Sequence, residues 1–267
     1  MLNKLIIKFK FKLYKMFSKI FSVKKVCTDS GNFLLTTSTE NEVHRAFTFH
    51  EKEPETIAWI NSFSSIVENG DDIIFFDVGA NVGIYSLYAG TCYRQAQVVS
   101  FEPDSQSFGS LCRNININKL NILPYPFAIS DELGVGIVKL SSMNAGAGAC
   151  SLGDKYQFIN AADDEIFKQG IFFCSLDELV LHFNFPIPTF IKIDVDGIEA
   201  TILRGAKAVL GSDKCRGLLV EFQYETEADL NSIIDYLASL GFSISGKSDW
   251  IASFNLLKSR NFVFTKQ

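Results

Sequence analysis

The sequence is short of the features that mark several large classes of protein. Among its 267 residues there is no Cys-x-x-Cys pair, and the six cysteines do not stand at metal-ligand spacing with the three histidines. We therefore expect free thiols, a reducing compartment and no metal site. There is also no internal repeat or low-complexity tract, and a composition of 47% hydrophobic and 21% charged residues is that of a globular protein. Full disorder, collagen and a disulfide-rich miniprotein are excluded.

A long uninterrupted hydrophobic run is missing from the N-terminus. In residues 1–22 a lysine recurs every three or four positions, which argues against both a membrane-spanning helix and a cleaved signal peptide. The lysines share one stripe of a helical wheel and apolar residues cover the opposite arc, so the pattern predicts a basic amphipathic helix. The stripe contains Lys4, Lys8, Lys12, Lys15 and Lys19. Two readings stay open, namely a helix lying on an anionic membrane surface and a helix packed on its own domain with solvated lysines.

Acidic residues are absent from residues 1–28, which hold eight lysines. The rest of the chain has 17 basic and 30 acidic residues, a net charge of −13. Such a split indicates an arm over 1–28, an N-terminal extension over 29–70 and a main domain over 71–267. The acidic domain argues against a nucleic-acid partner, which requires a basic face.

From position 71 the sequence alternates between short buried strands and amphipathic helices. This alternation predicts an α/β domain with a mostly parallel sheet and helices on both faces. We expect strands at 72–78, 97–101, 121–129, 190–195 and 217–222, helices at 82–93, 105–118, 198–210 and 227–240, and a terminal hairpin of 242–245 with 261–265. An added strand at 134–140 and a mobile loop at 141–154 interrupt the alternation. Upstream, 32–37 and 44–50 are expected to be extended and 53–67 to be helical.

The first strand of the domain is followed by a glycine-bearing turn. Gly79 and Gly83 permit a tight turn, and the helix that begins near Asn81, after Ala80, points free N–H groups at a carboxylate or phosphate. Asp77 can take the opposite charge, so the segment suits an amino-acid zwitterion. The spacing lacks the Gly-x-Gly-x-x-Gly pattern of dinucleotide sites. A turn that merely needs glycines would read the same way.

Acidic residues follow the next two strands. Glu102 can accept hydrogen bonds from both hydroxyls of a ribose, although an acid at a helix entry is the alternative. Ser130 and Asp131 can meet an adenine edge, and turn chemistry explains them equally well.

The fourth strand ends in three acids within six residues, Asp194, Asp196 and Glu199. They can bind a cation or take a proton from a hydroxyl, and a solvated helix N-terminus is the alternative. Glu221 stands inside an apolar strand and needs a partner there, for which Lys192 is the candidate.

Six segments of the domain stand out together. They are DVGANVGIYS (77–86), VVSFEP (98–103), FAISD (127–131), SLDEL (175–179), IKIDVDGIEATILRGA (191–206) and LLVEFQ (218–223). In this order they resemble the FkbM family of S-adenosylmethionine-dependent methyltransferases. The resemblance covers about residues 71–223, and Asp196 stands where the family more usually has Glu.

The resemblance implies a class I, Rossmann-like methyltransferase domain. Its mostly parallel seven-stranded sheet has an antiparallel last strand. The methionine part of the cofactor would lie on Asp77, Gly79, Asn81 and Gly83, with Ala80 in the same turn. Glu102 would hold the ribose, and Ser130 or Asp131 the adenine.

The implied activity is O-methylation of a sugar, a glycan or a secondary metabolite, with a hydroxyl displacing the methyl group in line. Asp194 is the first choice for a general base, Glu199 the second, and Glu221 a supporting residue; Asp194 also borders the cofactor. A nicotinamide-dependent oxidoreductase and a catalytically silent, membrane-associated adaptor are the alternatives. We expect a cytoplasmic protein, with peripheral contact at the inner face of a membrane through 1–22 as one reading of the arm.

Overall fold

The computed structural model describes most of the chain. The described residues are 10, 22–67, 71–147, 150–152, 166–195, 197–224, 226–248, 252–254 and 257–266. The amphipathic helix expected over 1–22 lies outside this set except for residues 10 and 22, and Asp196 also lies outside it.

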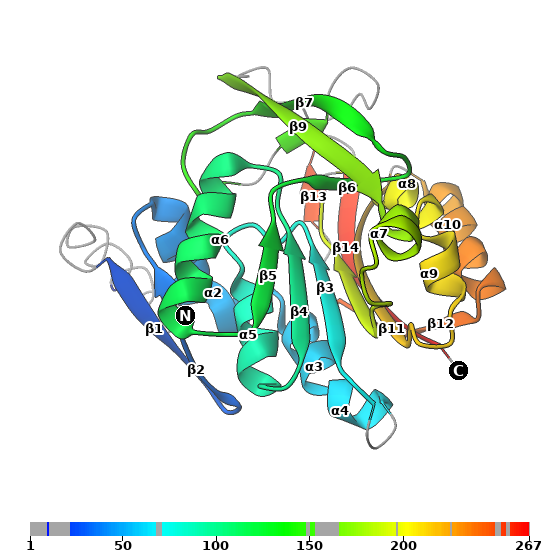
Figure 1. Cartoon of the computed structure of the whole chain (residues 1–267), viewed down its shortest axis with the longest axis horizontal. Helices are drawn as coiled ribbons and strands as arrows, with labels where there is room; N and C mark the ends of the chain where they lie inside the picture. Colours follow the sequence, from blue (N-terminus) through cyan, green and yellow to red (C-terminus); the bar gives the residue numbers. More distant parts are fainter. Residues whose placement is uncertain are drawn as a thin grey trace.

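The central feature is a sheet in the order β12-β14-β11-β10-β3-β4-β5 (Figure 1). All neighbouring pairs from β11 to β5 are parallel, whereas β14 runs antiparallel to both β11 and β12. The strands are β3 (Ile74–Val78), β4 (Gln97–Phe101), β5 (Ile122–Tyr125), β10 (Phe190–Ile193), β11 (Gly217–Tyr224), β12 (Phe242–Lys247) and β14 (Leu257–Lys266), with β13 (Ala252–Phe254) appended to β14. The predicted seven-stranded class I sheet with its antiparallel last strand is confirmed.

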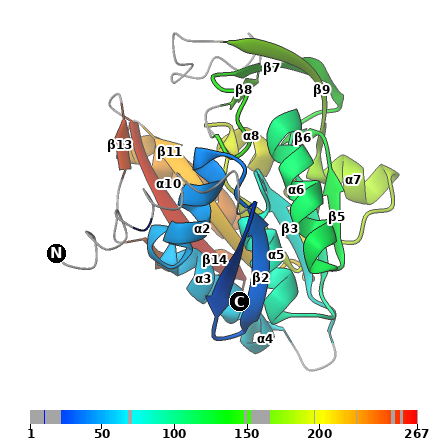
Figure 2. The same ribbon diagram turned by 90° about the vertical axis from the view of Figure 1, so that its left-hand side faces the viewer.

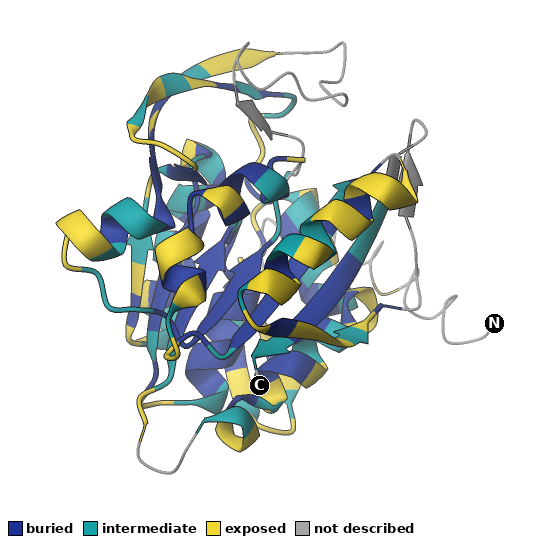
Figure 3. Cartoon of the chain, turned by 90° about the vertical axis from the view of Figure 1, so that its right-hand side faces the viewer, coloured by how far each residue is buried: buried dark blue, intermediate teal, exposed yellow. Residues whose placement is uncertain are grey.

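Helices cover both faces of this sheet, as predicted. Because neighbouring residues of a strand point to opposite faces, Phe75 and Phe76 belong to two separate apolar cores. One face carries α3 (Pro54–Asn61), α5 (Ile84–Cys92) and α6 (Ser105–Asn118), and the other carries α7 (Leu176–His182), α8 (Glu199–Arg204), α9 (Lys207–Gly211) and α10 (Glu227–Ser239). Figure 3 shows the second group with its exposed side outward and the buried strands behind it.

The N-terminal extension is part of the first of these cores. It consists of the antiparallel hairpin of β1 (Val23–Thr28) and β2 (Gly31–Thr36), followed by α2 (Glu40–Lys52), α3 and α4 (Phe63–Ile66). Phe33, Phe49 and Trp59 pack in one cluster with residues of β3 and α5. Figure 2 shows α2 and the hairpin on this side of the sheet. Position 28, where we expected the arm to end, lies at the turn of the hairpin, so residues 23–28 pair with the extension.

The prediction of an extended segment over 44–50 is wrong, since these residues lie within α2. Thr39 and Glu42 form a capping box that starts the helix. Val43, Ala46 and Phe49 then fall on one buried face. Among the described residues no helix is both long and apolar enough to span a bilayer.

A second, four-stranded sheet lies over the carboxyl ends of the main strands (Figure 1). Its order is β6-β9-β7-β8, with β6 (Ala128–Ser130), β7 (Gly134–Leu140), β8 (Cys150–Leu152) and β9 (Phe167–Ser175). The single strand predicted over 121–129 is therefore two strands. The chain leaves the main sheet at Tyr125, next to Pro126, which has no N–H to donate to a sheet ladder.

Candidate functional site

The turn after β3 is built so that only glycine fits at two of its positions. Gly79 has φ +80°, and a Cβ there would stand 2.0 Å from the backbone oxygen of Asp194. Gly83 has φ +86°, and its Cβ would meet the Leu111 side chain at 2.3 Å. The N–H groups of Gly79 and Ala80 both donate to the Phe101 carbonyl at 3.0 Å. The turn is thus fixed between the ends of β4 and β10 with its backbone in close contact with both.

Asp77 lies one residue before the end of β3 and is 1% exposed. Its Oδ2 accepts a hydrogen bond from Ser86 Oγ at 2.5 Å, while Oδ1 has no partner among the described residues. Burial raises the pKa of Asp77, and the nearby ammonium of Lys192 opposes that rise. A buried carboxylate oxygen without a donor is suited to a ligand that brings an ammonium group.

Glu102 follows β4, and its carboxylate joins the turn after β3 to the turn after β4. Its Oε2 accepts from the Asn81 N–H at 2.7 Å and its Oε1 accepts from the Asp104 N–H at 2.8 Å. Burial raises its pKa to about 8. Asp104, and not Glu102, caps α6, because its side chain accepts from the N–H groups of Gln106 and Ser107. The acid that caps the helix entry is therefore Asp104, so helix capping does not explain Glu102.

The loop after β7 closes against the same turn. The Asn81 side-chain amide donates to the Ala147 carbonyl at 3.0 Å, and Arg45 Nε donates to the Gly146 carbonyl at 3.1 Å. Thr39 Oγ1 donates to the Ala145 carbonyl at 2.7 Å. The first part of the predicted loop 141–154 is therefore held by α2 on one side and by the β3 turn on the other.

Asp194, directly after β10, pairs with the lysine two residues before it. Lys192 Nζ lies 2.6 Å from Asp194 Oδ2, and the Asp194 side chain is 28% exposed while that of Lys192 is 1% exposed. Burial alone would raise the pKa of Asp194, but the Lys192 ammonium and a hydrogen bond from Glu221 outweigh it and hold that pKa well below its usual range. Asp194 is therefore a fixed, ionised carboxylate with an accessible edge.

Glu221 does not have the partner that the sequence suggested. Its Oε1 accepts from Ser259 Oγ, and its other neighbour is Asp194, whereas Lys192 pairs with Asp194. Burial and then the negative charge of Asp194 raise the pKa of Glu221 to about 8. Glu221 is thus the protonated member of a carboxyl pair near neutral pH.

These groups form a polar row on one face of the sheet. Strand register places Asp77 beside Lys192 and Glu221 beside Asn261. One pleat below Asp77 and Lys192 the same face is apolar, with Phe75 and Phe190 in the core, and Leu219, the register partner of Lys192, lies one pleat below Glu221. The face changes from apolar to charged only at the carboxyl ends of the strands, where ligands bind in open α/β sheets.

The remaining predicted site residues lie at other places. Glu199 is 2% exposed and its Oε1 accepts from the Gly197 N–H at 2.9 Å, at the start of α8. Ser130 is buried in β6, and its carbonyl would be 2.4 Å from a Cβ on Gly205. Asp131 follows it at an exposed position. The backbone of Ser130 and Asp131 lies against Gly205, between α8 and α9.

Comparison with known proteins bears on this arrangement. A family model described as the methyltransferase FkbM domain matches residues 77–244, from Asp77 to β12. The chain belongs to the FkbM methyltransferase family. Membership of this family argues against the oxidoreductase alternative.

Relatives of this FkbM methyltransferase are distant. The hexuronic acid methyltransferase AglP of Haloferax volcanii is 26% identical over 146 residues, which are 54% of each chain, so the match spans about half the length of that relative. Methyltransferase 1 of Beauveria bassiana is 22% identical over 72% of this chain and 82% of its own. The solved structure of a SAM-dependent methyltransferase from Agrobacterium tumefaciens has a TM-score of 0.50 and 10% identity, and covers 92% of this chain and 71% of that one. The last match supports the fold alone.

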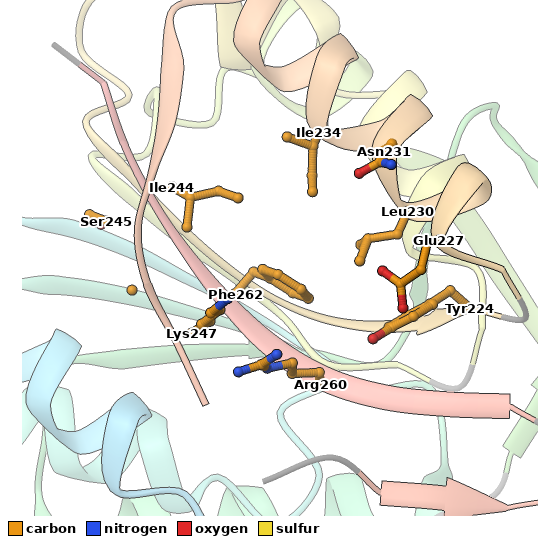
Figure 4. A pocket seen from close by; sticks show the side chains of 11 residues that line it. Tyr224, Glu227, Leu230, Asn231, Ile234, Ile244, Ser245, Lys247, Arg260 and Phe262 are labelled. Atoms are coloured by element: carbon orange, nitrogen blue, oxygen red, sulfur yellow. The ribbon is translucent and has the colours of Figure 1, made fainter. Parts of the chain in front are cut away.

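A pocket on the FkbM methyltransferase lies between elements at one side of the sheet. It has a volume of about 440 Å³ and lies between α10 and the strands β12 and β14 (Figure 4). Leu230, Ile234 and Phe262 point into it, with Glu227 and Arg260 beside them. Within the described parts of the chain, no group of three or more His, Cys, Asp or Glu is placed to hold a metal ion.

The sequence analysis did not identify two further residues that lie next to the polar row of the FkbM methyltransferase. Tyr85 on α5 lies with its ring centroid 5.0 Å from Lys192 Nζ. Glu53, in the N-terminal extension, is 6% exposed. Its negative charge raises the pKa values of Tyr85, Lys192 and Glu221. No local pattern marks either residue, since both join the row only through packing of the extension on α5.

Proposed function

We propose that this methyltransferase transfers a methyl group from S-adenosylmethionine to a hydroxyl of a sugar or glycan. The observation that carries the proposal is Asp194, an ionised and partly exposed carboxylate whose backbone oxygen abuts Gly79 of the β3 turn. The name of the archaeal relative, a hexuronic acid methyltransferase, favours a sugar acceptor. A hydroxyl of a secondary metabolite is the second acceptor class.

The residues around the β3 turn fit the parts of the cofactor. Asp77 Oδ1, which has no partner in the described chain, would take the ammonium of the methionine part. The close backbone of Gly79, Ala80, Asn81 and Gly83 leaves no side chain between the cofactor and the turn. Each oxygen of Glu102 accepts one backbone N–H and keeps a lone pair for a ribose hydroxyl. Ser130 and Asp131 remain the proposed adenine contacts.

The bound cofactor supplies an activated methyl group. Asp194 accepts the hydrogen of the acceptor hydroxyl, which orients an oxygen lone pair towards the methyl carbon. With the cofactor bound, the methyl carbon would be available to the acceptor oxygen with the sulfur as leaving group, and Asp194 would take the hydroxyl proton. Lys192 holds the carboxylate in place at 2.6 Å, and Glu221 donates to it. Glu199 is less suited to the same task, because it is 2% exposed whereas the Asp194 side chain is 28% exposed.

The acceptor class can be found with a cell extract and cofactor that carries a labelled methyl group. We expect the label in a soluble saccharide or a lipid-linked glycan. Label confined to small non-carbohydrate metabolites would overturn the sugar assignment. Cofactor binding without transfer to any pool would support the silent adaptor instead.

Asp194→Asn tests the role of the carboxylate, because it keeps the shape and removes the charge. We expect turnover to fall by about 10²- to 10⁴-fold with cofactor affinity nearly unchanged. Glu227→Gln, at the pocket beside α10, is the matched control and should keep wild-type turnover. Wild-type turnover by Asp194→Asn would refute the proton-acceptor role.

A further inference from the structure

Glu53 carries a buried carboxylate that does not cap a helix. It forms the corner between α2 and α3, where Pro54 begins the second helix. The Glu53 carbonyl already accepts the first N–H groups of α3, from Thr56 at 3.1 Å and Ile57 at 3.3 Å. The side chain makes no helix-capping hydrogen bond. Its carboxylate instead lies inside the protein, with Lys52 Nζ at 3.0 Å and Thr56 Oγ1 at 3.2 Å.

Burial, and then the Glu53 carboxylate, raise the pKa of Tyr85 on α5 well above its ordinary value. Helix α2 is pressed onto this side of α5, since the ring of Phe49 lies 6.3 Å from the ring of Tyr85 and 5.2 Å from that of Tyr88. The Tyr85 ring in turn faces Lys192 Nζ at 5.0 Å. A continuous chain of contacts thus runs from the extension through Tyr85 to Lys192 and on to Asp194.

Glu53 contributes to the charge balance of this chain. Lys192 is 1% exposed, and a lone buried ammonium would be unstable. Three carboxylates raise the pKa of Lys192, those of Asp194, Glu53 and Asp77 in order of decreasing effect. If Asp194 accepts a proton during reaction, Glu53 and Asp77, the register partner of Lys192, are the carboxylates that remain to keep Lys192 charged.

We propose that Glu53 is a positioning residue of the methyltransferase, acting through Tyr85 and Lys192 to fix the Asp194 carboxylate. It lies upstream of residues 77–244, the part that matches the family model. The inference rests on the proposed function, because it assumes that Asp194 is the carboxylate that meets the acceptor. It makes the N-terminal extension a contributor to the active site as well as to the core.

The test measures the charge at the site without an acceptor. Side-chain carboxyl carbons of the full chain are titrated by NMR in the wild type and in Glu53→Gln. The groups facing Glu221 are Asp194 after β10, Glu53 from the extension and Ser259 on β14, with Lys192 and Asp77 farther along the row. Removing the Glu53 charge should lower the pKa of Glu221, which is about 8, by about one pH unit, and should leave the separate titration of Glu102 in place.

Three variants keep this test decisive. Glu51→Gln removes a charge from an exposed position of the same helix and should leave the titration unchanged. Glu53→Asp keeps the charge and should restore most of the wild-type curve. Tyr85→Phe keeps the ring over Lys192 but removes the hydroxyl, and should give part of the shift. If the pKa of Glu221 is unchanged in a folded Glu53→Gln variant, the inference is overturned.

Turnover separates this inference from the proposed function. With the labelled-methyl assay, Glu53→Gln should lower kcat by about tenfold or more with little change in KM for the cofactor. If Asp194→Asn is inactive while Glu53→Gln has the wild-type kcat and pH profile, only the positioning role fails. If Asp194→Asn is fully active, the proposed function fails first.

Discussion

At the scale of single residues, Glu102 is the group whose protonation should govern cofactor binding. Its pKa is raised by burial from the ordinary value of 4.5 to about 8. The folded protein therefore binds this proton more tightly than the unfolded chain does. The stabilisation from the protonated carboxyl is complete below about pH 4.5, and is lost as the pH rises through about 8.

We predict that affinity for S-adenosylhomocysteine rises between pH 6.5 and pH 9. Ribose hydroxyls donate to the ionised carboxylate, so binding favours the charged form and releases a proton below pH 8. Titration calorimetry in two buffers of different ionisation enthalpy would count that proton. Glu102→Gln should bind at least tenfold more weakly and release no proton, whereas Glu132→Gln, at an exposed position, should behave as the wild type. A wild-type affinity that is flat with pH would contradict the ribose assignment.

At the scale of elements, the sequence was most informative where a pattern is local. Helix α6 and strand β7 have the predicted bounds. The Asp104 cap marks the start of α6, and a short apolar run marks β7. Segment 44–50 misled because His-Arg-Ala-Phe-Thr-Phe-His alternates like a strand. The capping box at Thr39 and the buried stripe of Val43, Ala46 and Phe49 decided for the helix. Alternation over seven residues is compatible with either element when the burial partner is unknown.

The candidate site divides in the same way. Asp77, Glu102 and Asp194 were predictable, because residues that follow parallel strands gather at one edge of a sheet. The sequence could not predict that Lys192 pairs with Asp194 and not with Glu221. Both carboxylates are within reach of one lysine, and the choice between them depends on the strand register. Glu53 could not be found at all, because its contact with Tyr85 depends on how α2 packs against α5.

The element that should respond to ligands is the loop after β7. Asn81, with φ +52°, holds the Ala147 carbonyl through its side-chain amide. Asn81→Gly relieves the backbone and removes that amide, so we predict cleavage between positions 141 and 154 that is several-fold faster in limited proteolysis. Saturating cofactor should slow wild-type cleavage more than cleavage of the variant.

Lys119→Gly is the matched control for the loop. Lys119 has φ +51° at the end of α6, so this change relieves a similar backbone conformation without touching the loop. We expect it to leave the cleavage rate unchanged and to raise stability by about 0.5–1 kcal/mol. Equal cleavage rates for both glycine variants would show that the Asn81 amide does not hold the loop.

At the scale of the whole molecule, charge is distributed very unevenly. The eight lysines of residues 1–28 precede a remainder with a net charge of −13. Part of that acidity now has a place in the structure, where the carboxylates of Asp194, Glu53 and Asp77 raise the pKa of Lys192. The lysine-rich stripe of 1–22 lies outside the described residues, and its contact with a membrane surface is our proposal.

Two variants separate the readings of that segment. A chain beginning at Ser22 keeps the carbonyl that accepts the Thr37 N–H at 2.9 Å, so the β1–β2 hairpin stays intact. If the segment lies on a membrane, this truncation should abolish sedimentation with anionic vesicles while cofactor affinity is unchanged. Glutamine at positions 4, 8, 12, 15 and 19 keeps the apolar arc, and should weaken binding to anionic vesicles by about 1 kcal/mol per lysine. Vesicle binding that survives both changes would assign the contact to another surface, and loss of thermal stability on truncation would favour packing on the domain.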